Sequence, residues 1–226
     1  MRRLAAAIVI AFLLWFVMFS QWTAPHLNFW GAMTFSACVL ILLSWFGVRS
    51  TRSRRNVLNP SELPSLWRGR GRLSSPLSSL LFPLLTAIII ASLLYLLFWI
   101  GDKLSQELFT FARPQVDSIY QMKDGTPSWL IALLLLFIIG PAEELFWRGY
   151  VQRTLTQRWT ANTGFVVTTL IYTAVHLPSM NFMLIMAAFT CGFCWGLLYR
   201  LFPQHFPAIV LSHALWDAAA FVWFPL

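Results

Sequence analysis

The hydrophobic residues of this chain gather in long, almost unbroken runs rather than in the alternating patterns of a soluble protein. A run of about 20 apolar residues is long enough to cross the hydrocarbon core of a bilayer as an α-helix. The pattern therefore predicts an all-α, polytopic transmembrane bundle of about seven helices, with a range of six to eight. The expected spans are Leu4 to Ser20, Trp30 to Val48, Leu80 to Ile100, Trp129 to Trp147, Phe165 to Leu177, Phe182 to Leu201 and Ala208 to Phe224, the fifth only if it extends into its flanks.

Composition supports a membrane protein. Of the 226 residues, 58% are hydrophobic and 11% are charged, whereas a soluble domain has about 25% charged residues. The net charge of +8 would suggest a nucleic-acid partner in a soluble protein. Here the basic residues sit in a few loops between apolar runs, so we expect the lipid bilayer and no nucleic acid as the partner.

The distribution of basic residues predicts the orientation. Loop 49–74 contains seven arginines, and alternation of the helices places six more arginines at ends on the same side. Lysine and arginine accumulate on the cytoplasmic side of membrane proteins. We therefore expect the basic loops to face the cytoplasm of a bacterial or archaeal plasma membrane, with residues 101–127 as the long outer segment. The six arginines are Arg2, Arg3, Arg148, Arg153, Arg158 and Arg200.

The two halves of the chain differ in their polar content. Residues 1–127 are interpreted as transmembrane anchor helices that carry the basic cytoplasmic loop 49–74. Residues 128–226 contain the ionisable groups that are expected inside spans, and such groups usually face a functional cavity. We therefore predict that residues 128–226 form the catalytic core.

The stretch "PAEELFWRGY" places two adjacent carboxylates and an arginine near the end of an apolar run. On a helix, Glu144 and Arg148 are four residues apart with the acid nearer the N-terminus, the favourable order for an ion pair. Glu143 is turned by about 100° from Glu144. It has no such partner in its own helix, and we expect it to face another surface.

Two histidines share helix faces with other polar side chains. Tyr172 and His176 are four residues apart, as are His213 and Asp217. Glu143 and His176 are almost equally far in sequence from a polar turn near Trp159 and Thr160. Two antiparallel helices joined at that turn would bring Glu143 and His176 to one depth.

This set of side chains suits hydrolysis. Glu143 could take a proton from water as a general base, and neutral histidines could donate hydrogen bonds to the oxyanion of an attacked amide. Asp217 could fix the tautomer of His213 or complete the donor set. Two histidines and a carboxylate, here Glu143, His176 and His213, could instead hold a catalytic zinc.

Three motifs resemble those of the Abi family, also called CPBP intramembrane proteases, which includes the type II CAAX prenyl endopeptidases. "EELFWR" is similar to E-E-x-x-x-R, "YTAVH" to F-x-x-x-H and "HALWD" to H-x-x-x-N/D, in the family's order. A looser similarity lies in "GFCWGLLY", and Tyr172 departs from the usual phenylalanine.

The resemblance implies that Glu143 activates water and that Glu144 and Arg148 form a supporting pair. It also implies that His176, His213 and Asp217 orient the water and stabilise the oxyanion. We expect a glutamic-type intramembrane endopeptidase without a cofactor, with zinc as the alternative.

The expected substrate is a membrane-anchored protein or peptide, reached from the lipid or the cytoplasm. Two other functions remain open: a non-catalytic partner-binding or bacteriocin-immunity protein of the same family, and a small ion or proton carrier. The carrier is disfavoured because residues 4–48 and 80–100 offer almost no intramembrane charge.

Overall fold

The computed structural model describes residues 1–56 and 76–226, and every regular element in these ranges is helical. The greater part of the predicted basic loop, residues 57–74, lies outside the described residues. Within these described ranges, six helices are long and apolar enough to cross a membrane. The chain is thus an integral, multi-pass membrane protein, and the predicted all-α bundle is confirmed.

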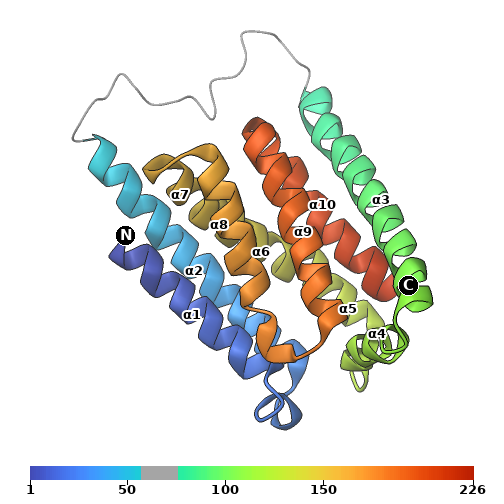
Figure 1. Cartoon of the computed structure of the whole chain (residues 1–226). Helices are drawn as coiled ribbons and strands as arrows, with labels where there is room; N and C mark the ends of the chain where they lie inside the picture. Colours follow the sequence, from blue (N-terminus) through green and yellow to red (C-terminus); the bar gives the residue numbers. More distant parts are fainter. Residues whose placement is uncertain (57–75) are drawn as a thin grey trace.

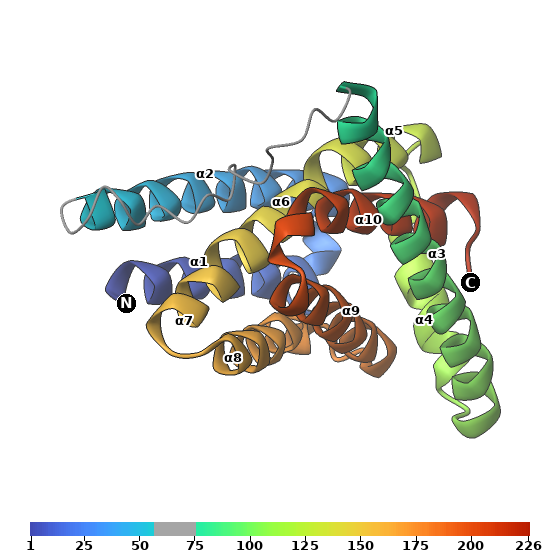
Figure 2. The same cartoon turned by 90° about the horizontal axis from the view of Figure 1, so that it is seen from above.

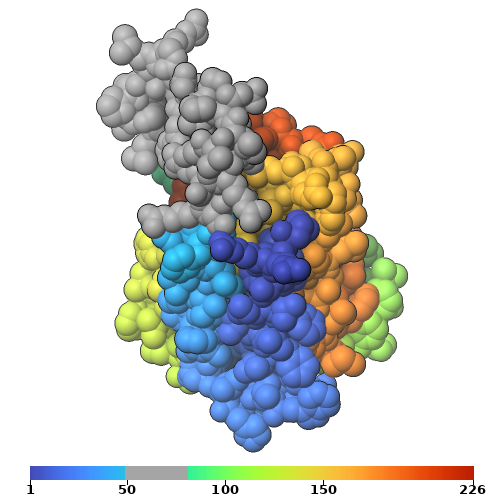
Figure 3. All heavy atoms as spheres, turned by 90° about the vertical axis from the view of Figure 1, so that its left-hand side faces the viewer, coloured from blue at the N-terminus to red at the C-terminus, as the bar shows by residue number. Residues whose placement is uncertain are grey.

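The first three long helices agree in position with the first three predicted spans. They are α1 (Arg2–Phe19), α2 (Phe29–Asn56) and α3 (Pro76–Leu108). Figure 3 shows α1 and α2 side by side on one face of the molecule. Helix α3 continues two turns past its predicted end, so the beginning of the expected outer segment is helical and belongs to a candidate span.

The fourth span is one continuous helical rod from Ser128 to Arg158. It comprises α5 (Ser128–Leu134), α6 (Gly140–Glu144) and α7 (Arg153–Arg158), which are joined by π-helical turns. π-Turns widen a helix locally and occur frequently at functional sites. Figure 2 shows α6 between α2 and α10 (Phe206–Ala218), so this rod lies inside the bundle.

The predicted fifth span is shorter than a membrane-crossing helix. Helix α8 (Ala161–Ala174) begins directly after the expected turn at Trp159 and Thr160. Its 14 residues correspond to a length of about 21 Å, less than the ~30 Å of the hydrocarbon core. The chain then turns through Leu177–Ser179 into α9 (Phe182–Leu201), which has the predicted bounds.

The basic helix ends and the outer connections lie at opposite ends of the bundle. The end of α2, the α7–α8 turn and the start of α3 lie together at the top of Figure 1. The connection from α8 to α9 and the short helix α4 (Ala112–Tyr120) lie at the bottom. We name these the basic end and the outer end of the bundle.

Helix α10 approaches the central rod closely at Gly140. A Cβ atom added at this glycine would lie 2.8 Å from the Cα of Ala214. Only a residue without a side chain allows two backbones to come this near. The contact brings α10, with His213 next to Ala214, against the helical turn that carries Glu143 and Glu144.

Candidate active site

Glu144 and Arg148 form the ion pair that their spacing predicts. The Arg148 Nη1 donates to Glu144 Oε1 at 2.7 Å, and the two side chains are almost completely buried, with 1% and 0% exposure. Nη2 of Arg148 donates to the backbone carbonyls of Cys191 and Gly192 at 3.2 Å each. The arginine therefore fastens the central rod to α9 rather than reaching the membrane surface.

His213 extends this ion pair into a chain of polar contacts. Its Nδ1 donates to Glu144 Oε1 at 2.8 Å, and its Nε2 lies 3.4 Å from Asp217 Oδ2. The imidazole is stacked on Trp195 with ring centroids 3.8 Å apart. The sequence paired His213 with Asp217, but the shorter contact is with Glu144.

Glu143 faces a different neighbour from Glu144, as their angular separation on the helix predicts. Its Oε2 accepts a hydrogen bond from the hydroxyl of Tyr172 at 2.8 Å, and the residue is 5% exposed. Tyr172, the departure from the family's phenylalanine, thus contacts the candidate general base directly. Its ring packs edge-on against Trp147.

His176 is held by contacts at both of its ring nitrogens. Nδ1 lies 2.8 Å from the carbonyl oxygen of Tyr172, so this nitrogen carries the proton and donates it. Nε2 accepts from the indole N–H of Trp15 at 3.2 Å. In this arrangement His176 has no N–H left for an oxyanion. The expected donor role therefore lacks a donor here, because the single N–H of the neutral ring donates to the Tyr172 carbonyl and the other nitrogen accepts from Trp15.

The positions proposed for zinc, Glu143, His176 and His213, do not fit a metal as they are arranged. Each ring nitrogen of both histidines faces another partner. Among the described residues, no three His, Cys, Asp or Glu side chains lie close enough together to hold a metal ion. We therefore derive no step of the reaction through zinc.

The candidate site lies at the wall of an apolar cavity of about 650 Å³. Glu143, Tyr172 and His176 contribute to its lining, as do His213 and Asp217 on α10. Most of the remaining wall is aromatic or aliphatic. The convergence expected for Glu143 and His176 is confirmed in this respect: both face one cavity, and Tyr172 touches both.

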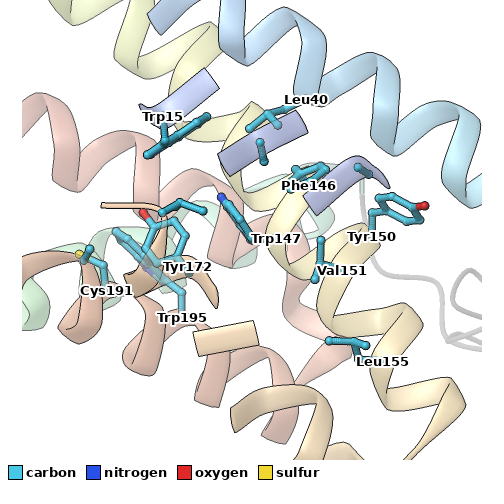
Figure 4. Packing of buried hydrophobic residues seen from close by; sticks show 14 of the residues in the cluster. Trp15, Leu40, Phe146, Trp147, Tyr150, Val151, Leu155, Tyr172, Cys191 and Trp195 are labelled. Atoms are coloured by element: carbon cyan, nitrogen blue, oxygen red, sulfur yellow. The ribbon is translucent and has the colours of Figure 1, made fainter. Parts of the chain in front are cut away.

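Two tryptophans at the site were not singled out from the sequence. Trp15 lies in a purely apolar run, where nothing distinguishes it from a packing residue. Trp195 lies within "GFCWGLLY", and its indole N–H donates to Ser212 Oγ at 3.1 Å. Figure 4 shows Trp15, Tyr172, Trp147 and Trp195 gathered around the same region of the core.

A polytopic helical bundle that buries two carboxylates, two histidines and an arginine beside an apolar cavity defines a class: a membrane protein with a buried ionisable site between its helices. Residues 125–219 match the family model described as Type II CAAX prenyl endopeptidase Rce1-like. This range is therefore similar to CAAX-protease domains, and it contains the candidate site residues from Glu143 to Asp217. No curated protein and no solved structure matches the chain.

Proposed function

We propose that this protein is an intramembrane endopeptidase that hydrolyses a peptide bond of a membrane-associated protein or peptide with water activated by Glu143. The observation that carries the proposal is the different placement of the two adjacent carboxylates. Glu144 is bound to Arg148 and His213, whereas Glu143 faces the cavity with one oxygen held by Tyr172. A fixed carboxylate at a cavity wall is suited to general-base catalysis.

The proposed reaction uses the second oxygen of Glu143. This oxygen takes a proton from a water molecule, the hydroxide attacks the peptide carbonyl, and the tetrahedral oxyanion collapses while Glu143 returns the proton to the leaving amine. His213 and Asp217 face the same cavity. We assign the oxyanion to the Nε2–H of His213, whose contact with Asp217 is the longer of its two at 3.4 Å, and Asp217 orients this imidazole. Glu144 and Arg148 position His213, and His176 positions Tyr172 and thereby Glu143.

We also propose that the protein has no resident cofactor and that its basic end faces the cytoplasm. The imidazoles of His176 and His213 already use both nitrogens, which favours a glutamate-type reaction over a zinc-type reaction. The accumulation of arginine at the basic end supports a cytoplasmic location for that end.

The test compares wild-type protein with Glu143→Gln in a host membrane that lacks the chain. New peptide termini in membrane proteins are identified by mass spectrometry of both samples. We expect termini that arise with wild-type protein and disappear with Glu143→Gln, because the amide cannot accept the proton. Glu107→Gln, which changes an exposed glutamate of α3, is the matched control and should retain them.

Equal cleavage by wild-type protein and Glu143→Gln would refute the assignment of the general base. A second outcome is that wild-type protein produces no new termini, but wild-type protein and Glu143→Gln both reverse a change that loss of the chain causes in the host cell. In that case the partner-binding or immunity role would replace proteolysis.

A further inference from the structure

The cavity extends from the candidate site toward the outer end of the bundle and away from the basic end. Each long helix that lines it contributes residues from its outer half alone, for example Phe19 at the end of α1 and Trp30 at the start of α2. The outer segment supplies Tyr120 and Met122. A substrate that enters this cavity therefore reaches Glu143 from the outer end.

Packing closes the route from the basic end. Beyond Glu143 the central rod buries Phe146, Tyr150, Val151 and Leu155, each at most 4% exposed. Figure 4 shows these side chains following one another along the rod. Protein interiors packed in this way leave no space for an extended peptide. We expected an opening either sideways to the lipid or toward the cytoplasm, and this packing disfavours an opening at the basic end.

Asp102 is a buried carboxylate in the outer part of the cavity wall. The residue is 6% exposed, and its Oδ2 accepts from Gln106 Nε2 at 2.6 Å. Its Oδ1 is buried and has no hydrogen-bond partner within residues 1–48 and 81–226, for which side chains are described. The neighbouring Lys103 lies 3.7 Å from Oδ2, and its own side chain is 57% exposed.

Asp102 belongs to the interior of the bundle and not to the lipid surface, because it is buried and lines the cavity. Burial raises the pKa of the Tyr120 phenol, and the nearby charge of Asp102 raises this pKa as well. Tyr120 lies on α4 and lines the outer part of the same cavity. A buried carboxylate oxygen without a donor is costly unless a ligand supplies one.

We propose that Asp102 is a specificity-determining residue, which binds a cationic side chain of an apolar peptide segment that occupies the cavity. The assignment rests on the proposed proteolytic function and adds the chemical class of the substrate. The apolar walls take the hydrophobic residues of the segment. The Asp102 carboxylate, which belongs to the cavity wall, turns toward the cavity and accepts a hydrogen bond from a lysine or arginine near the outer end of the segment. Charge complementarity selects such a peptide over one with a neutral or acidic residue at that position.

The test measures binding and not cleavage, so that it is independent of the proposed reaction. The protein carries Glu143→Gln and is held in lipid nanodiscs. The probes are three fluorescent synthetic peptides with the same short leucine–alanine segment and with lysine, glutamine or glutamate at one end. Fluorescence anisotropy gives the Kd of each.

We expect the Kd of the lysine peptide to be lower than that of the glutamine peptide by a factor of about ten or more, because only the lysine can form a charge-assisted hydrogen bond with Asp102. Asp102→Asn should remove this difference in Kd. The Kd of the glutamine peptide should stay the same in this variant, and an unchanged value would show that the cavity is still formed. Asp102→Lys should reverse the order in favour of the glutamate peptide. Asp117→Asn is the matched control, because this half-exposed acid of α4 pairs with Arg113 and does not line the cavity.

Equal affinities for the lysine and glutamine peptides, a lysine preference that survives Asp102→Asn, or no binding of any peptide would each overturn the proposal. A protein that shows the lysine preference but cleaves nothing when Glu143 is present would retain this binding site and lose the proposed catalysis. The two failures are therefore distinguishable.

Discussion

Replacing Arg148 by methionine tests whether the buried ion pair holds the site together. Methionine keeps an unbranched side chain of similar length but removes the guanidinium. The substitution deletes the 2.7 Å contact with Glu144 and the two donors to the α9 carbonyls of Cys191 and Gly192. Glu144, which is fully buried, keeps His213 as its remaining partner.

The expected loss of stability is large because a buried charge loses its counter-charge. Removal of one partner of a buried pair costs about 3–5 kcal/mol. For a chain of this size, each kcal/mol lowers Tm by about 2–4 °C. We therefore expect Tm to fall by about 6–20 °C. Adding Glu144→Gln to Arg148→Met removes the unpaired carboxylate and should recover part of the loss, so the two substitutions are non-additive.

Thermal unfolding in nanodiscs, followed by tryptophan fluorescence, measures the effect. Arg158→Met is the matched control: this arginine lies exposed at the end of the same rod, and its replacement should change stability by less than about 0.5 kcal/mol. If Arg148→Met melts at the wild-type temperature, or if the double variant loses the sum of the two single losses, the pair does not stabilise the fold as inferred.

Three further predictions concern the site and its packing. Tyr172→Phe keeps the ring against Trp147 but removes the hydroxyl from Glu143; we expect the rate of terminus formation to fall about tenfold, and an unchanged rate would contradict a positioning role. Gly140→Ala would push a Cβ into the backbone of Ala214 and should destabilise the protein by about 1–3 kcal/mol, whereas Gly101→Ala, where a Cβ meets nothing within 4 Å, should not lower Tm. Cleavage should survive chelation with no zinc detected by metal analysis, and activity that is lost on chelation and restored by zinc would refute the glutamate-type reaction.

The features that could be predicted from sequence are those set by local spacing. A long apolar run fixes a membrane helix, and α9 has the bounds that its run predicts. The ion pair between Glu144 and Arg148 depends only on four-residue spacing within one helix. The angular separation of Glu143 from Glu144 follows from the same geometry, and each carboxylate has a different neighbour in the structure.

The features that were missed depend on packing between distant segments. Trp15 contacts His176 across 161 positions of the chain, and no local pattern marks this tryptophan. Asp102 follows the predicted end of the third span, where a polar residue suggests a loop. Helix α3 continues past it to Leu108 and packs against α4 and α10, so the burial of Asp102 was not visible in the sequence.

The contrast between Glu143 and Glu144 explains how this fold can keep several charges in an apolar interior. Glu144 is balanced by Arg148 and bonded to His213, so its burial connects the central rod to α9 and α10. Glu143 instead accepts a hydrogen bond from a neutral donor, the Tyr172 hydroxyl. A neutral donor orients a carboxylate without cancelling its charge, and an uncancelled charge at a cavity wall can accept a proton. The neighbouring pair therefore gives this part of the rod the rigidity that the proposed role of Glu143 requires.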